Sequence, residues 1–158
     1  MENKPLFKIV LVAPEIPGNT GSIGRTCVAL NLELILIKPY GFDLSEKAVR
    51  RAGLDYWKHV KITEYETWEE FITQEAPPVD KLFFFENHQE KTIYQGNYSE
   101  GCYLIFGSET KGISEDILKD YRDRLFELPM YSQYIRSLNL SNAATAIAYE
   151  CLRQLRFS

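Results

Sequence analysis

The chain has 158 residues, enough for one compact domain over residues 1–158 and too few for two ordinary ones. Its composition, with 45% hydrophobic, 13% aromatic and 25% charged residues, excludes a disordered chain, and its net charge of −4 argues against indiscriminate nucleic-acid binding. No apolar run approaches the ~20 residues of a membrane-spanning helix, and the first residues lack the pattern of a signal peptide, so we expect a cytoplasmic protein with no membrane contact.

The cysteine and histidine residues form no recognisable metal or disulfide pattern. Cys27, Cys102 and Cys151 are odd in number, far apart and without a CxxC spacing, which predicts reduced and mostly buried thiols. His59 and His88 have no partner at the spacing of a metal site or a catalytic triad, which predicts surface positions. We therefore expect no metal site.

The first elements predict a strand, a helix and a second strand. The apolar run over residues 7–13 lies between breakers and is typical of a buried strand. A helix should begin near Asn19 or Thr20, which can cap free backbone N–H groups, and a second strand should cover residues 32–38. The residues expected on the inner side of the helix are Ile23, Cys27, Val28 and Leu30.

The same alternation continues in the next segment. The pattern predicts a short helix over residues 45–53, which ends at a glycine, and a third strand near residues 60–63. Thr67 followed by Glu70 is typical of a capping box, so a further helix should run from there to about Glu75.

The second half of the chain completes an α/β pattern. We expect strands at residues 81–86, 103–107 and 125–130, a short helix at 114–121 and a last helix at 141–156. Strands that alternate with helices predict a parallel sheet covered on both faces, with ligands at the carboxyl ends of the strands. The loops 14–24, 107–114 and 130–142 each follow a predicted strand or lie at its end, so they could gather at this edge.

Two familiar nucleotide-binding motifs match these loops poorly. Gly18, Gly21 and Gly24 have the spacing GxxGxxG instead of GxGxxG, and the second strand ends in Lys38 instead of an acidic residue. A lysine there could still meet the extra phosphate of NADP, so this interpretation stays open. The loop "GSETKGIS" is no P-loop and could be a solvated turn, although Gly107 would let a ligand approach the backbone closely.

A basic segment with aromatic residues suggests a second kind of contact. Arg50, Arg51 and Lys58 lie close in sequence to Tyr56 and Trp57. Such charged faces are commonly just solvated, but basic and aromatic groups together also suit RNA phosphates and bases.

Taken together, the three loops resemble the motifs of the SPOUT class of RNA methyltransferases. "PEIPGNTGSIGRTC" looks like its first motif, "LIFGSETKGI" like its second and "LPMYSQYIRSLNLSNAATAIAYE" like its third, and the likeness covers nearly the whole chain. Within the class, "YGFDLSEKAVRRAGLDYW" and the short length are similar to the TrmL group. Those enzymes use S-adenosylmethionine to methylate the ribose 2′-oxygen of the wobble nucleotide 34, cytidine or modified uridine, in leucine tRNAs.

The resemblance implies a parallel-sheet fold with a C-terminal deep trefoil knot, a homodimer and a set of site residues. The basic segment predicts RNA contacts for Arg50, Arg51 and Lys58. The resemblance places Tyr149 near the dimer interface, so each active site could take Arg25 from the partner chain. It implies catalytic roles for Arg25, Glu109 and Asn142. The positions that match the cofactor pocket are Phe85, Gly107, Leu128, Met130, Ser137 and Asn139.

Several questions stay open at this point. Arg25 could lose its proton in a special site, or it could orient a phosphate and the hydroxyl while another group accepts the proton, because a guanidinium normally stays charged. Glu109 could favour the positive charge of the cofactor or hold the shape of its loop, and Asn142 could also cap the last helix. The alternatives to the TrmL activity are a SPOUT enzyme acting on another tRNA site or on ribosomal RNA, and a catalytically silent RNA-binding module.

Overall fold

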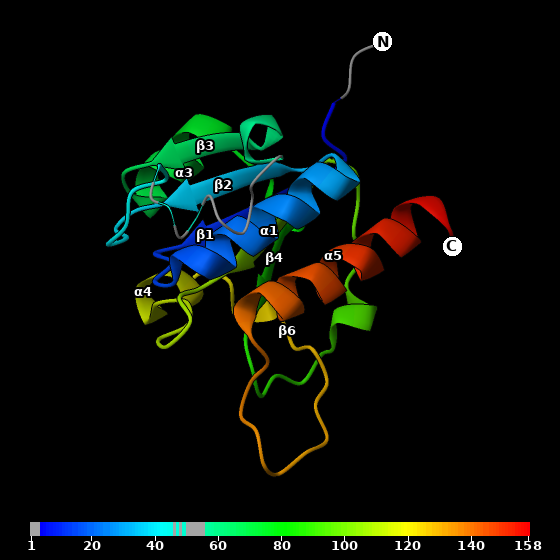
Figure 1. Ribbon diagram of the computed structural model, residues 1–158. Coiled ribbons are helices and arrows are strands. Elements are labelled where there is room, and N and C mark those ends of the chain that lie inside the picture. Colours follow the sequence, from blue (N-terminus) through cyan, green and yellow to red (C-terminus); the bar gives the residue numbers. More distant parts are fainter. Residues whose placement is uncertain (1–3, 46, 48, 50–55) are drawn as a thin grey trace.

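The structure is a computed structural model that describes residues 4–45, 47, 49 and 56–158. Over these residues the chain forms one parallel sheet of six strands in the order β3-β2-β1-β5-β4-β6, with helices on both faces (Figure 1). The strands are β1 (Lys8–Val12), β2 (Glu33–Ile37), β3 (Lys61–Tyr65), β4 (Leu82–Phe85), β5 (Tyr103–Phe106) and β6 (Leu125–Phe126). The helices are α1 (Pro17–Leu30), α3 (Trp68–Glu75), α4 (Glu115–Leu118) and α5 (Leu140–Arg156). Short 3₁₀ turns occupy Trp57–His59, Val79–Lys81, Ile93–Gln95 and Arg122–Arg124. The predicted order of strands and helices is confirmed throughout the described residues.

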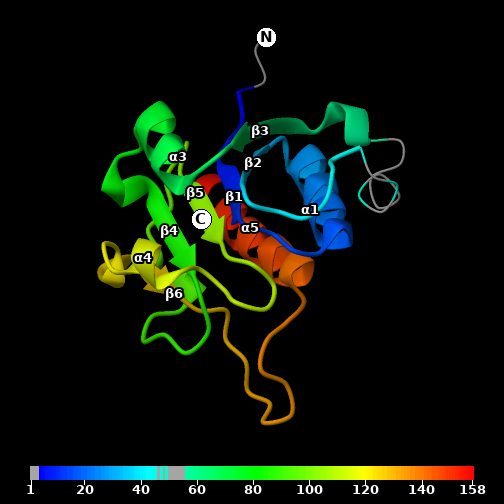
Figure 2. The ribbon, with the colours of Figure 1, turned by 90° about the vertical axis from the view of Figure 1, so that its left-hand side faces the viewer.

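Each central strand contributes side chains to two separate cores. Ile9 and Leu11 of β1 point to one face of the sheet and Val10 to the other, as the two-residue period of a strand requires. The first core is covered by α1 and α5, and the second by α3 and α4, which lie on opposite sides of the sheet in Figure 2. Both faces are therefore apolar, and the central strands are mostly continuous hydrophobic runs, unlike the edge strand β3.

The first helix begins earlier than the sequence predicts. Its N-cap is Ile16 and Pro17 is its first residue, so the expectation of a start at Asn19 or Thr20 is wrong. Proline suits this position because its φ is already helical and its missing N–H would have had no partner. Ile23 and Cys27 are fully buried as predicted, whereas Val28 is only partly buried.

The capping residue of α3 is Thr67, as predicted. Its hydroxyl accepts a hydrogen bond from Glu70 N at 3.0 Å. The Glu70 carboxylate accepts from Glu66 N at 3.1 Å instead of closing the box on Thr67. The helix predicted at residues 45–53 lies mostly outside the described residues.

The last strand is shorter than its apolar pattern indicates. β6 ends at Phe126, although Glu127 still pairs through its backbone with residues 91–93. Pro129 cannot donate a ladder hydrogen bond, so the strand predicted to residue 130 ends early. Residues 131–139 are exposed, and in Figure 1 this segment extends away from the sheet before α5 begins.

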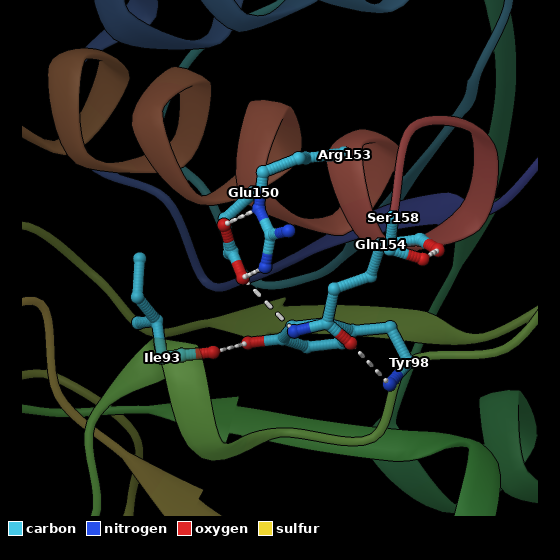
Figure 3. A network of polar contacts seen from close by, with 6 residues as sticks. All are labelled: Ile93, Tyr98, Glu150, Arg153, Gln154 and Ser158. Atoms are coloured by element: carbon cyan, nitrogen blue, oxygen red, sulfur yellow. Dashed lines mark hydrogen bonds and ion pairs between the residues drawn. The ribbon is translucent and has the colours of Figure 1, made fainter.

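Helix α5 is fixed at both ends. Its N-cap is Asn139, whose side-chain oxygen accepts from the backbone N of Ser141 and Asn142, so Asn142 is not the capping residue. Near the C-terminus the buried Glu150 accepts hydrogen bonds from Arg153 and Gln154 (Figure 3). Gln154 in turn accepts from Tyr98 N, and the Tyr98 hydroxyl donates to Ile93 O, so α5 is tied to the segment before β5.

The cysteines and histidines lie where the sequence predicts. All three cysteines are buried and unbridged, and His59 and His88 are exposed. Within the described part of the chain, no group of three or more His, Cys, Asp or Glu residues is placed to hold a metal ion. No helix among the described residues is long and apolar enough to cross a membrane.

Candidate active site

A cavity of about 640 Å³ opens at the carboxyl edge of the sheet. It lies beside the point where the strand order reverses between β1 and β5, which is the usual ligand position in open α/β sheets. Its volume is within the range of small-molecule sites. Seven of the residues predicted for the active site line it: Phe85, Gly107, Glu109, Leu128, Met130, Ser137 and Asn139.

The wall after β5 depends on Gly107. The chain folds back so closely that a Cβ built on Gly107 would lie 2.0 Å from Gly112 C and 2.2 Å from Ile113 N. Two backbone hydrogen bonds between Ser108 and Gly112, at 3.0 and 3.3 Å, close this turn, and Gly112 takes a φ of +69°. Only a residue without Cβ fits at position 107, so the glycine shapes the cavity through its missing side chain.

Glu109 holds two of the three loops together. Its carboxylate accepts hydrogen bonds from Glu15 N at 2.7 Å, Ile16 N at 3.0 Å and the Asn19 side-chain amide at 3.1 Å. Both oxygens are thereby engaged at the N-terminus of α1, where a negative charge is also favoured by the helix dipole. This geometry supports the interpretation that Glu109 holds the shape of its loop.

Glu15, in the loop after β1, makes a similar contact with the loop after β5. Its carboxylate accepts from the Thr110 hydroxyl at 2.7 Å and from Thr110 N at 2.9 Å. These hydrogen bonds lower the pKa of Glu15. The loops after β1 and β5 are therefore joined by two reciprocal carboxylate contacts, and the cavity edge is preorganised.

Glu86 is a cavity residue that the sequence reasoning missed. It follows β4 directly, lines the cavity and accepts a hydrogen bond from Ile113 N at 2.5 Å. Burial raises the pKa of its carboxyl, and the bond from Ile113 offsets only part of this. The sequence signal that could have identified it is a glutamate directly after the apolar run "LFFF", at the strand end where ligands bind in such sheets.

Two predicted catalytic residues lie outside the cavity of their own chain. Arg25 is exposed on α1, with its guanidinium 5.1 Å from the centre of the Tyr56 ring, and Asn142 is exposed in the first turn of α5. The two helices pack side by side, joined by a 2.7 Å hydrogen bond between the hydroxyls of Thr26 and Thr145. Within one chain, Arg25 and Asn142 therefore do not line the cavity that the other predicted residues line, and their catalytic roles stay predictions.

The predicted RNA-binding residues are only partly described. Lys58 is exposed in the 3₁₀ turn Trp57–His59. Arg50 and Arg51 lie outside the described residues.

Comparison with known proteins identifies the family. A family model described as the SpoU rRNA Methylase family matches residues 6–149. The chain belongs to this family. The tRNA (cytidine(34)-2′-O)-methyltransferase of Saccharophagus degradans is 42% identical to this SpoU-family chain over 154 residues, which cover 97% of the chain and 98% of that protein. The protein of the same name from Burkholderia ambifaria is 37% identical and covers 96% and 97%.

Solved structures agree with this family membership. A structure described as giving insights into the 2-OH methylation of C/U34 on tRNA superimposes with a TM-score of 0.85 at 40% identity, covering 94% of this chain and 95% of that one. The SpoU methyltransferase AviRb of Streptomyces viridochromogenes, in complex with the cofactor AdoMet, gives a TM-score of 0.82 at 27% identity and covers 96% and 61%.

The cavity of this SpoU-family chain has the chemistry that such a cofactor requires. Phe85 and Phe106 stack at a centroid distance of 5.1 Å and give an apolar wall, together with Leu128 and Met130. Gly107 leaves backbone groups open to close approach. An apolar pocket with a few convergent polar groups suits a nucleoside-sized ligand.

Proposed function

We propose that the chain transfers a methyl group from S-adenosylmethionine to the ribose 2′-hydroxyl of nucleotide 34, a cytidine or a modified uridine, in leucine tRNAs. The observation that carries this proposal is the near full-length similarity, at 42% and 37% identity, to tRNA (cytidine(34)-2′-O)-methyltransferases. The cavity at the carboxyl edge of the sheet supports it independently.

The cofactor would be held by the cavity residues. Phe85, Leu128 and Met130 would cover its apolar faces, and Ser137 and Asn139 would supply hydrogen-bonding groups. When bound, S-adenosylmethionine supplies an electrophilic methyl group attached to a positively charged sulfur. The two carboxylate contacts, of Glu109 with the loop after β1 and of Glu15 with the loop after β5, would keep the cavity edge in place while RNA approaches. Correct positioning of the methyl donor and the RNA would then contribute to the rate of methyl transfer.

Arg25 would act on the RNA. Its guanidinium lies 5.1 Å from the centre of the Tyr56 ring. A charged guanidinium donates hydrogen bonds and cannot accept a proton, so we favour the hypothesis that Arg25 orients a phosphate and the attacking hydroxyl while another group accepts the proton of that hydroxyl. Lys58, together with Arg50 and Arg51, would contact tRNA phosphates.

A composite site in a homodimer accounts for the position of Arg25. Arg25 is exposed on α1 and lies outside the cavity of its own chain, and Tyr149 on α5 is 51% exposed. Pairing of the α1 and α5 surfaces of two chains would bring Arg25 of one chain to the cavity of the other. We also propose the C-terminal deep trefoil knot, with α5 passing through a loop formed by preceding segments; the TM-score of 0.85 to a tRNA 2-OH methylation structure supports it.

A mixed dimer tests the composite site. Arg25→Ala alone should abolish transfer but leave cofactor affinity near that of the wild type. Gly107→Ala should bind the cofactor at least tenfold more weakly, so its transfer is slow at low cofactor concentration. Co-expressed and purified as a heterodimer with two affinity tags, the two chains should transfer methyl groups faster at low cofactor concentration than either homodimer does, because one intact cavity then meets one intact Arg25. A heterodimer no faster than either homodimer would contradict action across the interface.

The reaction itself is tested with labelled methyl groups. Transfer from S-adenosylmethionine to total tRNA lacking its wobble ribose methylation is followed by nuclease mapping. We expect label on the 2′-oxygen of nucleotide 34 of leucine tRNAs. Label elsewhere in tRNA, or only in ribosomal RNA as the family description allows, would change the substrate. Cofactor binding without transfer to any RNA would favour a silent module.

A further inference from the structure

Glu86 is held rigidly at the wall of the cavity. Its backbone N donates to Phe126 O at 3.1 Å, which fixes it between β4 and β6. Its side-chain Oε1 accepts from Ile113 N at 2.5 Å, in the loop after β5. A Cβ added to Gly112 would lie 2.6 Å from Oε1 and 2.9 Å from Oε2, so this glycine leaves the room that the carboxylate occupies.

The second oxygen of Glu86 has no protein partner among the residues that the structure describes. Among the described residues, nothing donates a hydrogen bond to Oε2 and no cation pairs with the carboxylate. Glu109, the other carboxylate lining the cavity, has both oxygens engaged by the loop after β1. Glu86 is only partly exposed and burial raises the pKa of its carboxyl, so a hydrogen bond from a ligand to Oε2 would offset the hydration that the charged form loses. The arrangement therefore favours a ligand that brings a hydrogen-bond donor to this point.

We propose that Glu86 Oε2 accepts a hydrogen bond from a ribose hydroxyl of the methyl donor, which makes Glu86 a cofactor-binding residue. The inference rests on the proposed function, because it takes S-adenosylmethionine as the ligand of the cavity. Carboxylates suit ribose hydroxyls, as in dinucleotide-binding folds, where an acidic residue meets the 2′-hydroxyl. An ammonium group is more strongly hydrated, so the charged amino-acid end of the donor is expected nearer to solvent than this partly buried oxygen.

Glu86→Gln is a sharp test of this contact. The amide oxygen can keep the bond from Ile113 N, and the amide NH₂ then faces the cavity in place of the acceptor. The matched control is Glu90→Gln, which makes the same change in charge at an exposed residue that does not line the cavity. Thermal unfolding checks that both variants stay folded.

The probes are S-adenosylmethionine, S-adenosylhomocysteine, 5′-methylthioadenosine and the 2′-deoxy and 3′-deoxy forms of the last, each titrated calorimetrically. We expect Glu86→Gln to weaken the three ribose-containing probes by the same factor, roughly 10- to 100-fold. At least one deoxy probe should have the same affinity for Glu86→Gln as for the wild type. Glu90→Gln should bind every probe with wild-type affinity.

The contrary outcomes are distinct. Equal affinities of the wild type and Glu86→Gln for every probe would overturn the inference, as would equal losses for both deoxy probes. A loss confined to S-adenosylmethionine would also overturn it, because it would mean that Glu86 senses the positive sulfur. A wild-type protein that binds none of the probes would instead refute the proposed function.

Discussion

For the replacement of Gly107 by alanine, the structure allows the loss of unfolding free energy to be worked out from specific contacts. The added Cβ would lie 2.0 Å from Gly112 C, whereas ordinary contact begins near 3.4 Å, so one side of the turn must move by more than an ångström. Both contacting atoms belong to the backbone, so no side-chain rotation can relieve the clash. The movement would break or lengthen the two hydrogen bonds between Ser108 and Gly112.

The expected loss follows from these two effects. Overpacking costs about 1–3 kcal/mol and the two lost backbone hydrogen bonds about 1 kcal/mol each, so we expect Gly107→Ala to lower the free energy of unfolding by about 3–5 kcal/mol. The cavity wall moves with the turn, so affinity for S-adenosylhomocysteine should fall at least tenfold, the equivalent of about 1.4 kcal/mol.

Urea unfolding at one protein concentration and calorimetric titration measure the two effects. The matched control is Gly18→Ala, in the first turn of α1, where an added Cβ meets nothing within 4 Å. Alanine favours a helix over glycine, so this control should be neutral or more stable by up to about 1 kcal/mol. A Gly107→Ala protein with wild-type stability and wild-type affinity would refute the argument that the missing side chain shapes the cavity.

Three further predictions concern local contacts. Thr67→Ala should cost about 1 kcal/mol of unfolding free energy and Thr67→Ser much less, because only alanine removes the cap of α3; equal losses in urea unfolding would contradict this. Burial acts to raise the pKa of Glu75, but hydrogen bonds from Tyr65 and Tyr103 outweigh it, so the pKa lies below its ordinary value. The stability that ionised Glu75 provides is therefore present above the unfolded pKa of 4.5 and lost as the pH falls through the folded pKa. Between about pH 6 and pH 3, the free energy of unfolding of the wild type should fall more steeply than that of Glu75→Gln. Parallel curves for the two proteins would contradict this prediction. Glu109→Gln turns an amide donor toward backbone N–H groups, so it should lower the free energy of unfolding by about 1–3 kcal/mol and slow methyl transfer. Unchanged stability and an unchanged transfer rate would show that Glu109 does not hold the two loops together.

The sequence predicts the sheet well because its strands are short apolar runs between breakers. Both faces of a parallel sheet are covered, so β1, β2, β4 and β5 are apolar along their length and stand out from the helices. β6 is the exception, because the residues after Phe126 are apolar for a different reason: Leu128 and Met130 line the cavity. An apolar pattern does not distinguish a strand from a pocket wall.

The parts of the site that could not be predicted depend on contacts between distant segments. Helix α1 begins at Pro17, earlier than predicted. The backbone N–H groups just before it, of Glu15 and Ile16, donate to Glu109, which lies more than 90 residues later in the sequence. In the sequence Glu86 is only the last, polar residue of a predicted strand, and nothing there shows its contact with Ile113, which lies in the loop after β5. The motifs name Arg25 beside the cofactor residues, but a linear motif cannot tell whether two residues meet within one chain or between two.

The central claim is that the ribose 2′-hydroxyl of nucleotide 34 accepts the methyl group. The most direct measurement compares two leucine tRNAs that differ in one atom, one with cytidine and one with 2′-deoxycytidine at position 34, each incubated with the protein and labelled S-adenosylmethionine. We expect label in the first tRNA and none in the second. Equal labelling of both would contradict it, because the methyl group would then be attached to some other atom.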